Sequence, residues 1–431
     1  MFALVDGNNF YVSCERAFRP SLKRHPVVVL SNNDGCAISR SNEAKELGIK
    51  MGQPWFECRE LAEVYGVVAL SANFTLYGDM SDRMMCTAAG LGHNQEIYSI
   101  DECFVDMAGI RGDLTRRAQT MRTRILQHTG IPTGIGIAPT KTLAKLANHV
   151  AKSADRKPGS YPAELARVCN LGALPASDLD AVLAATEVGD VWGVGRRISK
   201  QLAAAGITNA LQFAQLDPAT VRRRWSVVLE RTVRELQGQS CIRLEDAPPP
   251  KQEIAHTRSF GRPVRGLDDL IQAVTEFAAR AASKLRRQSS LAGQVCVFIH
   301  TSPFRPPPHY SRSTSVPLRR PTANTQDLVH AAVLGLRAIY RPGFDYIKAG
   351  VMLLDLNDDS VEQLELQLDA APDQGGELMA AMDRINDRFG RGTITLASAG
   401  TRRAERTWVL RQQLLTPAYT TSWDALPVAK A

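Results

Sequence analysis

The chain has 431 residues, 44% of them apolar and 22% charged, and its 52 Lys and Arg against 44 Asp and Glu give a net charge of +8. This composition is typical of a folded protein, not a disordered or fibrous one, and the length suggests about three domains. No run approaches the ~20 consecutive apolar residues of a membrane helix, and we expect no signal peptide at the N-terminus. Eight scattered cysteines without a C-x-x-C pair disfavour a disulfide scaffold or a zinc finger and suit a reducing cytoplasm.

The first 160 residues alternate short apolar runs with amphipathic stretches, which predicts an α/β domain. The predicted strands and helices are Phe2–Val5, Val27–Leu30, Ile97–Ile100 and Cys103–Met107 as strands, and Ser41–Leu47 and Thr140–Lys152 as helices. Residues 165–240 contain helical patterns broken by Gly193-Val194-Gly195 and by Gly206. We predict a small all-α unit there.

Ala247–Pro250 is a proline-rich stretch and predicts a stiff linker. The pattern beyond it is β-α-β-β-α-β, the order of a split βαβ, ferredoxin-like domain. Its predicted elements are Glu253–Phe260, Leu267–Arg287, Gln294–His300, Ser313–Leu318, Thr325–Tyr340 and Tyr346–Leu356. A further helix is predicted at Glu377–Phe389.

The charge is distributed unevenly along the chain. Residues 251–350 contain 15 Lys and Arg and 6 Asp and Glu, a net of +9, whereas residues 351–400 contain 3 and 10, a net of −7. A basic block with ordinary core residues is the electrostatic footprint of a nucleic-acid-binding domain, although a solvated basic surface would give the same count. The acidic block would be repelled by DNA, so we expect it to face protein.

Carboxylates interrupt the apolar strands at two places. Asp6 ends the first predicted strand, and Asp101-Glu102 separate the predicted pair Ile97–Ile100 and Cys103–Met107. If these strands are neighbours, the three acids converge at one edge of a sheet, where a divalent cation would relieve their repulsion. Two Mg²⁺ there would serve in-line phosphoryl or nucleotidyl transfer. The alternative is a hairpin tip with solvated acids and an unrelated strand-end Asp.

Basic residues accompany these acids. Lys141, Lys145 and Lys152 fall on one side of the predicted helix 140–152, opposite its apolar side, which predicts a lysine row facing outward. The row is either a solvated face or a triphosphate clamp. Asp190–Arg197 has the form of a helix-hairpin-helix turn, in which glycines let main-chain N–H groups reach a DNA phosphate, unless it is only a turn.

Several runs together resemble the Y-family of lesion-bypass DNA polymerases, and within it the branch of UmuC, the catalytic subunit of bacterial DNA polymerase V. The likeness spans nearly the whole chain and rests on Asp6-Gly7-Asn8-Asn9-Phe10-Tyr11, Ser99-Ile100-Asp101-Glu102, Thr140–Asn148, Val191–Lys200 and Leu415–Thr421. The resemblance implies a multidomain α/β right hand and an error-prone translesion polymerase of the SOS DNA-damage response. The implied divisions are a palm (1–30 and 75–164), small fingers (31–74), a helix-hairpin-helix thumb (165–240), a ferredoxin-like little finger (251–355) and a C-terminal partner-binding extension (356–431).

The resemblance also implies residue roles. Asp6, Asp101 and Glu102 would be catalytic and hold two Mg²⁺, with the Gly7 carbonyl as an added ligand, and Tyr11 would be the steric gate that rejects a 2′-OH. The deoxynucleoside triphosphate would be bound by Phe10, Tyr11, Ser39, Asn42, Lys45 and Lys152, and the DNA backbone by Gly193, Val194, Gly195, Arg196 and Arg197.

The sequence departs from the family pattern in the tail and at Gly7. Gln363, Leu364 and Leu366 lie where the family carries a sliding-clamp peptide, but the terminal aromatic anchor is missing. Gly7 is smaller than the usual residue. The implied partners are primer-template DNA, a processed UmuD-type dimer, a RecA-type recombinase filament and the sliding clamp, with no membrane. The rival functions are another palm-type nucleotidyltransferase or cyclase, and a catalytically silent DNA-binding subunit.

Overall fold

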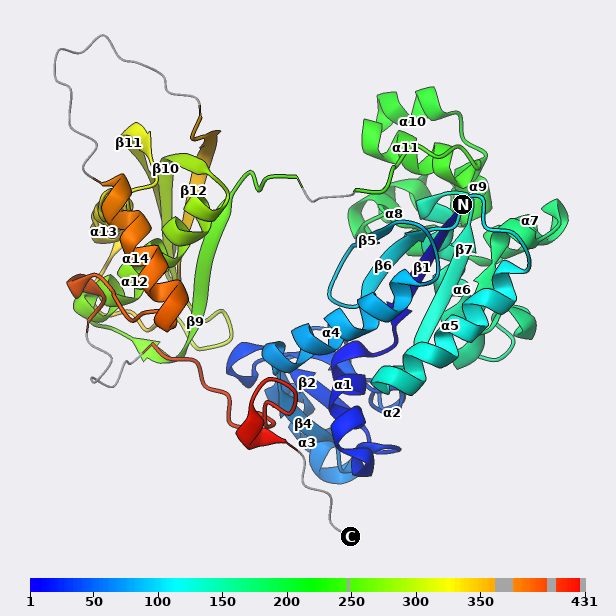
Figure 1. Ribbon diagram of the computed structural model, residues 1–431, viewed down its shortest axis with the longest axis horizontal. Coiled ribbons are helices and arrows are strands. Elements are labelled where there is room, and N and C mark those ends of the chain that lie inside the picture. The colour runs from blue at the N-terminus through cyan, green and yellow to red at the C-terminus, as the bar shows by residue number, and fades with distance from the viewer. Residues whose placement is uncertain (246–248, 361–374, 401–407, 427–431) are drawn as a thin grey trace. The chain divides into compact units, whose positions relative to one another are not determined.

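The computed structural model describes residues 1–245, 249–360, 375–400 and 408–426. The chain divides into two compact units, Met1–Pro248 with Leu414–Ala431, and Pro249–Gln413. Figure 1 shows the elements of each unit. Among the helices in the described ranges, none is both long and apolar enough to cross a membrane.

The first unit is built on a five-stranded sheet with the strand order β5-β6-β1-β7-β8. Its strands are β1 (Phe2–Gly7), β5 (Gln95–Ile97), β6 (Glu102–Asp106), β7 (Thr133–Ala138) and β8 (Val168–Asn170). β1 is the central strand and runs antiparallel to both β6 and β7. The condition set by the sequence is therefore met for Asp6 and Glu102, which lie on neighbouring strands, whereas Asp101 precedes β6.

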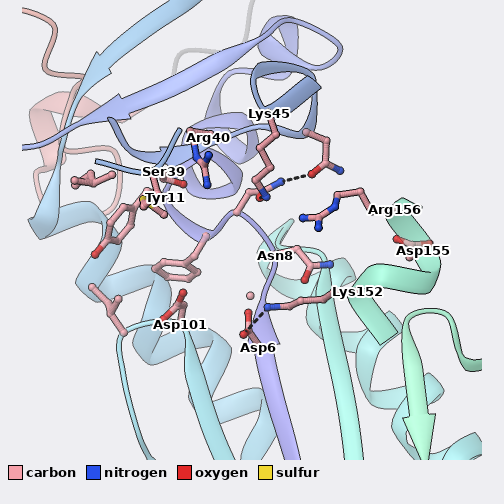
Figure 2. Close-up of a pocket in the computed structure, with 17 residues that line it drawn as sticks. Asp6, Asn8, Tyr11, Ser39, Arg40, Lys45, Asp101, Lys152, Asp155 and Arg156 are labelled. Atoms are coloured by element: carbon pink, nitrogen blue, oxygen red, sulfur yellow. Dashed lines mark hydrogen bonds and ion pairs between the residues drawn. The ribbon is translucent and has the colours of Figure 1, made fainter. Parts of the chain in front are cut away.

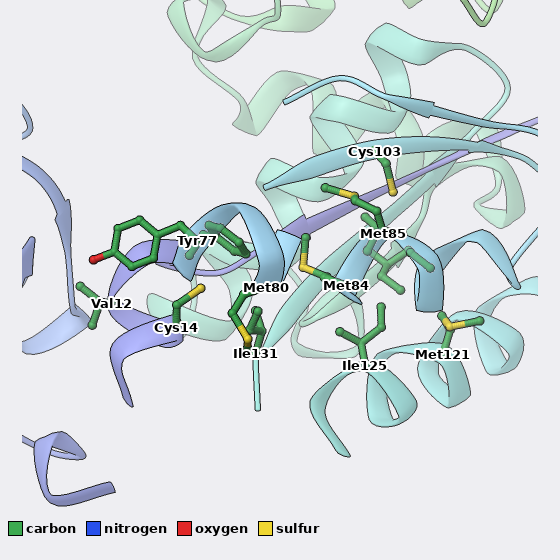
Figure 3. Packing of buried hydrophobic residues seen from close by; sticks show 14 of the residues in the cluster. Val12, Cys14, Tyr77, Met80, Met84, Met85, Cys103, Met121, Ile125 and Ile131 are labelled. Carbon is green, nitrogen blue, oxygen red and sulfur yellow. The ribbon is translucent and has the colours of Figure 1, made fainter. Parts of the chain in front are cut away.

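Helices cover both faces of this sheet, because successive side chains of a strand point to opposite faces. On one face, Ala3, Val5 and Val105 pack against α4 (Phe74–Ala89) and α5 (Leu114–Thr129), and Figure 3 shows Met80, Met84 and Met85 among Cys103, Met121, Ile125 and Ile131. On the other face, Leu4 and Phe104 pack against α6 (Lys141–Arg156). Leu143, Leu146 and Val150 turn the apolar side of α6 toward the sheet, as the pattern predicts.

A smaller layer follows β1 in the chain. It consists of α1 (Phe10–Phe18) and a three-stranded sheet in the order β3-β2-β4, whose strands are β2 (Val27–Leu30), β3 (Ala37–Arg40) and β4 (Val68–Ser71). The two short helices of this layer are α2 (Asn42–Glu46) and α3 (Trp55–Tyr65). Val28, Leu30, Ala37, Ala44 and Cys58 form its own small core.

Residues 165–240 are mostly helical, as predicted, but not entirely. Val168–Asn170 forms β8, which pairs in parallel with β7 and completes the first sheet, so the prediction of an all-α unit is wrong at its start. A three-residue strand has too few residues to show a periodicity of two. The helices that follow are α7 (Ala176–Ala185), α8 (Arg196–Ala204), α9 (Ala210–Ala214), α10 (Pro218–Arg224) and α11 (Val227–Leu236).

The second unit has the predicted β-α-β-β-α-β order. Its elements are β9 (Ile254–Val264), α12 (Leu267–Arg287), β10 (Ser290–Thr301), β11 (Ser311–Thr322), α13 (Thr325–Ile339) and β12 (Tyr346–Asp358). The sheet order is β11-β10-β12-β9, with every pair antiparallel, so each helix joins two strands that one other strand separates. This is the split βαβ arrangement.

The tail after β12 contributes to both units. The predicted helix is present as α14 (Gly376–Phe389), and Trp408 is 1% exposed in the core of the second unit, next to Phe277. From Leu414 onward the tail packs on the first unit, where Tyr419 stacks on Phe18. The described residues of the tail therefore pack partly on the second unit and partly on the first.

Candidate active site

Asp6 lies at the end of the buried central strand and directly faces Glu102. The two residues are register partners between β1 and β6, and Gly134 of β7 is the partner of Asp6 on its other side. Asp6 shares the sheet face of Leu4, and Glu102 that of Phe104, because the side-chain period of a strand is two. Both carboxylates therefore point toward α6.

Asp101 is placed by a tight turn between β5 and β6. The amides of Tyr98 and Ser99 both donate to the Glu102 carbonyl, at 3.0 and 3.1 Å, so the predicted strand Ile97–Ile100 ends at Ile97 instead. The Ser99 hydroxyl donates to Asp101 Oδ1 at 2.6 Å and accepts from the Glu102 amide at 3.1 Å. The Asp101 carbonyl accepts from the Gly7 amide at 2.8 Å, which holds this turn against the end of β1.

Each lysine of the predicted outward row is paired with an acid of the sheet. The Nζ–O distances are 2.7 Å for Lys141 to Glu96 on β5, 2.8 Å for Lys145 to Glu102, and 2.5 Å for Lys152 to Asp6. Lys141 is buried and Lys145 is only 16% exposed. The prediction of an outward-facing row is therefore wrong for these two, because helical periodicity identifies a polar side of a helix but not what lies opposite it.

The electrostatics of the acids follow from their burial. Burial raises the pKa of Asp6 to about 7, and the neighbouring Glu102 adds to this while the Lys152 ammonium opposes it. Burial alone would raise the pKa of Glu102 too, but hydrogen bonds with Asp6 and Lys145 and the charge of Lys145 lower it. The pKa values of the two carboxyl groups are therefore displaced in opposite directions, because the groups lie next to each other and each is paired with a lysine.

A cavity of about 410 Å³ opens over Asp6 and Asp101, and all of the predicted nucleotide-binding residues line it. Figure 2 shows Asp6 at the bottom of the view, Lys152 and Arg156 of α6 to its right, and Ser39, Arg40 and Lys45 at the top. The members of the predicted set that line it are Asp6, Gly7, Phe10, Tyr11, Ser39, Asn42, Lys45, Asp101 and Lys152, while Glu102 stands outside the lining. Residues as far apart in sequence as Asp6 and Arg156 are thus brought into one cavity.

One wall of the cavity is strongly cationic. Arg40, Lys45, Lys152 and Arg156 all line it. Burial lowers the pKa of Lys45 to about 8, and repulsion by Arg156 and Arg40 contributes. The Lys45 ammonium donates to Asn9 Oδ1 at 2.5 Å, and Asn9 Nδ2 donates to Asn42 Oδ1 at 3.1 Å. Clustered cations that repel one another are stabilised by a polyanion, so this wall suits a triphosphate.

An aromatic wall closes another side. Tyr11 is half-buried on α1, and its ring stacks on Tyr77 of α4 with centroids 4.6 Å apart and an interplanar angle of 17°. Phe74 meets Tyr11 edge-on at 5.9 Å. Burial and the nearby Asp101 carboxylate raise the pKa of the Tyr11 phenol. Tyr11 is therefore a rigidly held ring at the edge of the cavity.

Gly7 has a packing reason for being glycine. A Cβ built on Gly7 would lie 2.9 Å from Cδ2 of Phe10 and 3.2 Å from the sulfur of Met84. A larger residue at this position would push the Phe10 ring, which lines the cavity. The departure from the usual family residue is therefore matched by local packing.

The donor set at the end of β1 fits a divalent cation. In the described ranges no group of three or more His, Cys, Asp and Glu side chains forms a complete metal site, but Mg²⁺ needs only one or two carboxylates, with waters and substrate phosphates completing its shell. Asn8 Oδ1 and Asn148 Oδ1 are buried and accept no hydrogen bond. Both lie within 3.5 Å of a Cβ built on Gly134, the register partner of Asp6. The crowded acids and these orphaned acceptors are oxygen donors suited to Mg²⁺.

The predicted DNA-binding hairpin lies at the start of α8. Gly193 has φ 90°, a backbone conformation that favours glycine. Gly195 is the N-cap residue of α8, so no side chain of that residue bonds to the first N–H groups of the helix. Gly195, Arg196 and Arg197 are exposed, whereas Val194 is buried and anchors the turn in the core. The predicted clamp peptide, Gln363, Leu364 and Leu366, lies outside the described residues.

Sequence reasoning missed several residues around the acids. Arg40, Asp155 and Arg156 line the cavity, and Asn148 Nδ2 donates to Asp6 Oδ2 at 3.2 Å. Trp192 and Tyr98 flank the Lys145 ammonium, whose nitrogen lies 5.4 and 4.4 Å from their ring centroids. Arg156 and Asn148 are on the same helix as Lys152 and could have been found from its polar side. Arg40 and Trp192 depend on contacts that no local pattern reveals.

Comparison of the sequence with protein families gives three matches. The impB/mucB/samB family matches residues 5–149, and the C-terminal domain of that family matches residues 251–366. A domain of unknown function matches residues 377–429. The matched ranges include the three acids, the cationic residues Arg40 and Lys45, and the split βαβ domain.

Curated relatives cover the full chain. Protein UmuC of Salmonella typhimurium is 45% identical over 433 residues, with 99% of both chains covered, and protein ImpB of the same organism is 43% identical with full coverage of both. DNA polymerase IV 2 of Bacillus subtilis is 28% identical and covers 92% of this chain and 93% of its own. Among solved structures, a Y-family DNA polymerase chimera of Dbh and Dpo4 superposes with a TM-score of 0.65 over 83% of this chain and 100% of its own, at 17% identity.

Proposed function

This chain belongs to the impB/mucB/samB family and is an error-prone Y-family translesion DNA polymerase of the SOS type, and we propose that Asp6, Asp101 and Glu102 are its catalytic acids. The observation that carries the proposal is the position of the acids. Asp6 and Glu102 face each other in register, and Asp6 and Asp101 line a cavity that also contains four cationic side chains. Acids for metal and cations for phosphate in one hollow are the requirements of nucleotidyl transfer.

The polymerase homologues imply divalent metal ions, and in the proposed mechanism two Mg²⁺ are held by Asp6, Asp101, Glu102 and the Gly7 carbonyl. The metal ions would make the primer 3′-oxygen more nucleophilic and would neutralise charge on the phosphates. Lys45, Lys152, Arg40 and Arg156 bind the triphosphate and hold the pyrophosphate as the primer 3′-hydroxyl attacks the α-phosphate. Ser99 orients Asp101 through its 2.6 Å hydrogen bond.

The proposal also assigns the residues that contact the sugar of the nucleotide and the DNA backbone. The Tyr11 ring lies under the sugar and excludes a 2′-hydroxyl, with Phe10, Ser39 and Asn42 beside the nucleotide. The Gly193–Arg197 hairpin and the basic residues 251–350 bind the DNA backbone. Small fingers that leave the nascent base pair poorly enclosed give shape little selectivity, which permits insertion opposite damaged bases.

The division of the chain and its partners belong to the same proposal. We assign residues 1–30 and 75–164 to the palm, 31–74 to the fingers, 165–240 to the thumb, 251–355 to the little finger and 356–431 to a partner-binding extension. A processed UmuD-type dimer, a RecA-type filament and, through 363–366, the sliding clamp are its protein partners, in the cytoplasm. Trp423 is 88% exposed and gives this extension an apolar contact point.

The carboxylates are tested by substitutions that remove charge with little change of shape. Asp101→Asn should abolish nucleotide incorporation while primer-template binding stays close to wild type, because DNA affinity depends on the basic residues. Asp106→Asn is the matched control, since Asp106 is at the opposite end of β6 and its bond to the Ala108 amide survives in asparagine. Normal extension by a folded Asp101→Asn protein would exclude Asp101 from the metal site.

The partner-binding role of the tail needs a substitution that leaves the fold intact. Deletion of residues 357–431 would also remove the packing of Leu414 and Tyr419 on the first unit. Trp423→Ala avoids this. We expect it to lower damage-induced mutagenesis in cells at equal protein abundance while primer extension in vitro is unchanged, and equal mutagenesis would show that Trp423 contacts no partner.

A further inference from the structure

The C-terminal segment Leu414–Thr421 is fastened to the edge of the small sheet of the first unit. The Ser71 amide at the end of β4 donates to the Leu414 carbonyl at 2.9 Å, and the Leu414 amide donates to the Ser71 hydroxyl oxygen at 3.0 Å. Figure 1 shows this red segment beside β2, β4 and α1. The two bonds join residues that are 343 positions apart in sequence.

The contact becomes buried and specific at Thr416. Asn73, the N-cap of α4, donates from Nδ2 to the carbonyl oxygens of Thr416 and Pro417, at 3.1 and 3.2 Å. Thr416 is 6% exposed, and its hydroxyl donates to Glu15 Oε1 at 3.1 Å. Glu15 is fully buried, so the bond that Thr416 supplies is made in a region without competing water.

Glu15 connects the segment to the aromatic wall of the active site. The same oxygen, Oε1, accepts a second hydrogen bond from the Tyr77 hydroxyl at 2.7 Å, and the Tyr77 ring stacks on Tyr11. Glu15 and Tyr11 are four residues apart on α1 and therefore share one side of that helix. Tyr77 thus spans from Glu15 to Tyr11 along α1.

The buried Glu15 carboxylate accepts few hydrogen bonds, so the one from Thr416 matters to its position. A buried carboxylate is stabilised by the donors it accepts from, and Oε2 of Glu15 accepts no hydrogen bond. The carboxylate therefore depends on the two donors at Oε1. Without the Thr416 hydroxyl, the Tyr77 hydroxyl would be the remaining hydrogen-bond donor to Glu15 among the described residues, with the charge of Arg19 still acting on the carboxylate. The position of the Tyr77 phenol would then no longer be fixed from the side of the tail.

We propose that Leu414–Thr421 is an intramolecular strap that positions the Tyr11–Tyr77 pair, with Thr416 as the positioning residue, and so sharpens the discrimination between deoxyribonucleotides and ribonucleotides. The strap belongs to the part of the chain that matches a domain of unknown function. The inference rests on the proposed function, because it takes Tyr11 to be the wall against the 2′-hydroxyl.

The test compares two identical substitutions in the tail of the full-length protein. Thr416→Val removes the hydroxyl that donates to Glu15 and accepts from Asn73 Nδ2 at 3.3 Å, while Asn73 keeps its bonds to the two carbonyl oxygens. Thr420→Val removes a buried hydroxyl that makes no hydrogen bond to the described residues. The readout is the ratio of kcat/KM for a deoxynucleoside triphosphate to that for the matching ribonucleotide. We expect Thr416→Val to lower this ratio about threefold to tenfold, the effect of losing one hydrogen bond, with recovery in Thr416→Ser and no change in Thr420→Val.

Further variants separate positioning from simple destabilisation. Tyr77→Phe keeps the stacked ring but loses the bond to Glu15. If the strap acts through Glu15, the double variant Thr416→Val/Tyr77→Phe should be no worse than the more severe single variant. If the double variant instead lowers the ratio by the product of the two single effects, the proposal is overturned. An equal loss of both substrate classes in Thr416→Val would also overturn it, since a folding defect leaves the ratio unchanged.

Tyr11→Ala distinguishes failure of the strap from failure of the active-site assignment. If Tyr11→Ala lowers the ratio and Thr416→Val does not, the strap is refuted while Tyr11 remains the sugar wall. If Tyr11→Ala leaves the ratio at its wild-type value, the assigned role of Tyr11 is wrong, and the strap proposal is wrong with it.

Discussion

The buried ion pair between Lys141 and Glu96 should make the first unit sensitive to the loss of either partner. Lys141 Nζ lies 2.7 Å from Glu96 Oε2, and their side chains are only 2% and 9% exposed. Glu96 Oε2 also accepts from the Glu245 amide at 2.8 Å, and Lys141 donates to the Arg243 carbonyl at 3.3 Å. The pair therefore ties α6 and β5 to the chain that leads toward the second unit.

Replacing the lysine alone should be costly. Lys141→Met preserves most of the side-chain volume but leaves the Glu96 carboxylate buried without its cation, which should destabilise the unit by about 3–5 kcal/mol. The surface pair Arg83–Asp79, whose side chains are 56% and 30% exposed, is the control. Arg83→Met should cost only about 0.3–0.5 kcal/mol, because water screens an exposed pair.

Hydrogen–deuterium exchange of peptides from α6 measures the free energy of opening where the pair is located. Lys141→Met should lower that free energy by several times the effect of Arg83→Met. Adding Glu96→Gln, which removes the stranded charge and keeps an acceptor for Glu245, should restore part of the loss. Equal exchange in Lys141→Met and Arg83→Met, or further loss in the double variant, would refute the reasoning.

Three more outcomes follow from the structure. Tyr11→Ala should incorporate ribonucleotides far more readily, as matched kinetics with both substrate classes would show. His256, whose pKa is lowered to about 4 by burial and then by Arg280, Lys284 and Arg258, is held neutral in the fold. The contribution of neutral His256 to stability is fully present above the unfolded pKa of about 6.5 and is lost as the pH falls toward 4, because only the unfolded chain takes up the proton in this range. His256→Gln should therefore make the melting temperature depend less on pH between 4 and 6.5. Primer-template affinity should fall linearly on a log–log plot against salt, with a slope of ~0.9 per phosphate contact, and a flat plot would contradict binding by the basic residues.

The positions of the acids at strand ends could be predicted from the sequence, because Asp6 ends an apolar run and Asp101-Glu102 interrupt another. Their convergence could be given only as a condition, because it depends on the pairing of β1 with β6. The boundaries of β2 and α12 were also predictable, because a four-residue apolar run and a long amphipathic period leave little freedom. The strand-end positions and these boundaries need no knowledge of distant contacts.

Other features depend on contacts between segments far apart in the chain. The partners of Lys141 and Lys145 lie on strands about 45 positions away, so the periodicity of α6 could not show that its polar side faces acids. Thr416 meets Glu15 across 401 positions. The short strand β8 is defined by its pairing with β7, not by its own pattern. Sequence periodicity carries none of this information.

Primer extension on a template with a single damaged base tests the central assignment most directly. The purified full chain would be supplied with Mg²⁺ and deoxynucleoside triphosphates, alone and with a UmuD-type dimer and a RecA-type filament, next to its Asp101→Asn variant. We predict that the wild-type protein inserts a nucleotide opposite the lesion and extends beyond it, and that Asp101→Asn does neither. Synthesis that stops one nucleotide before the lesion under every condition, or a variant that bypasses it as well as wild type, would contradict the account.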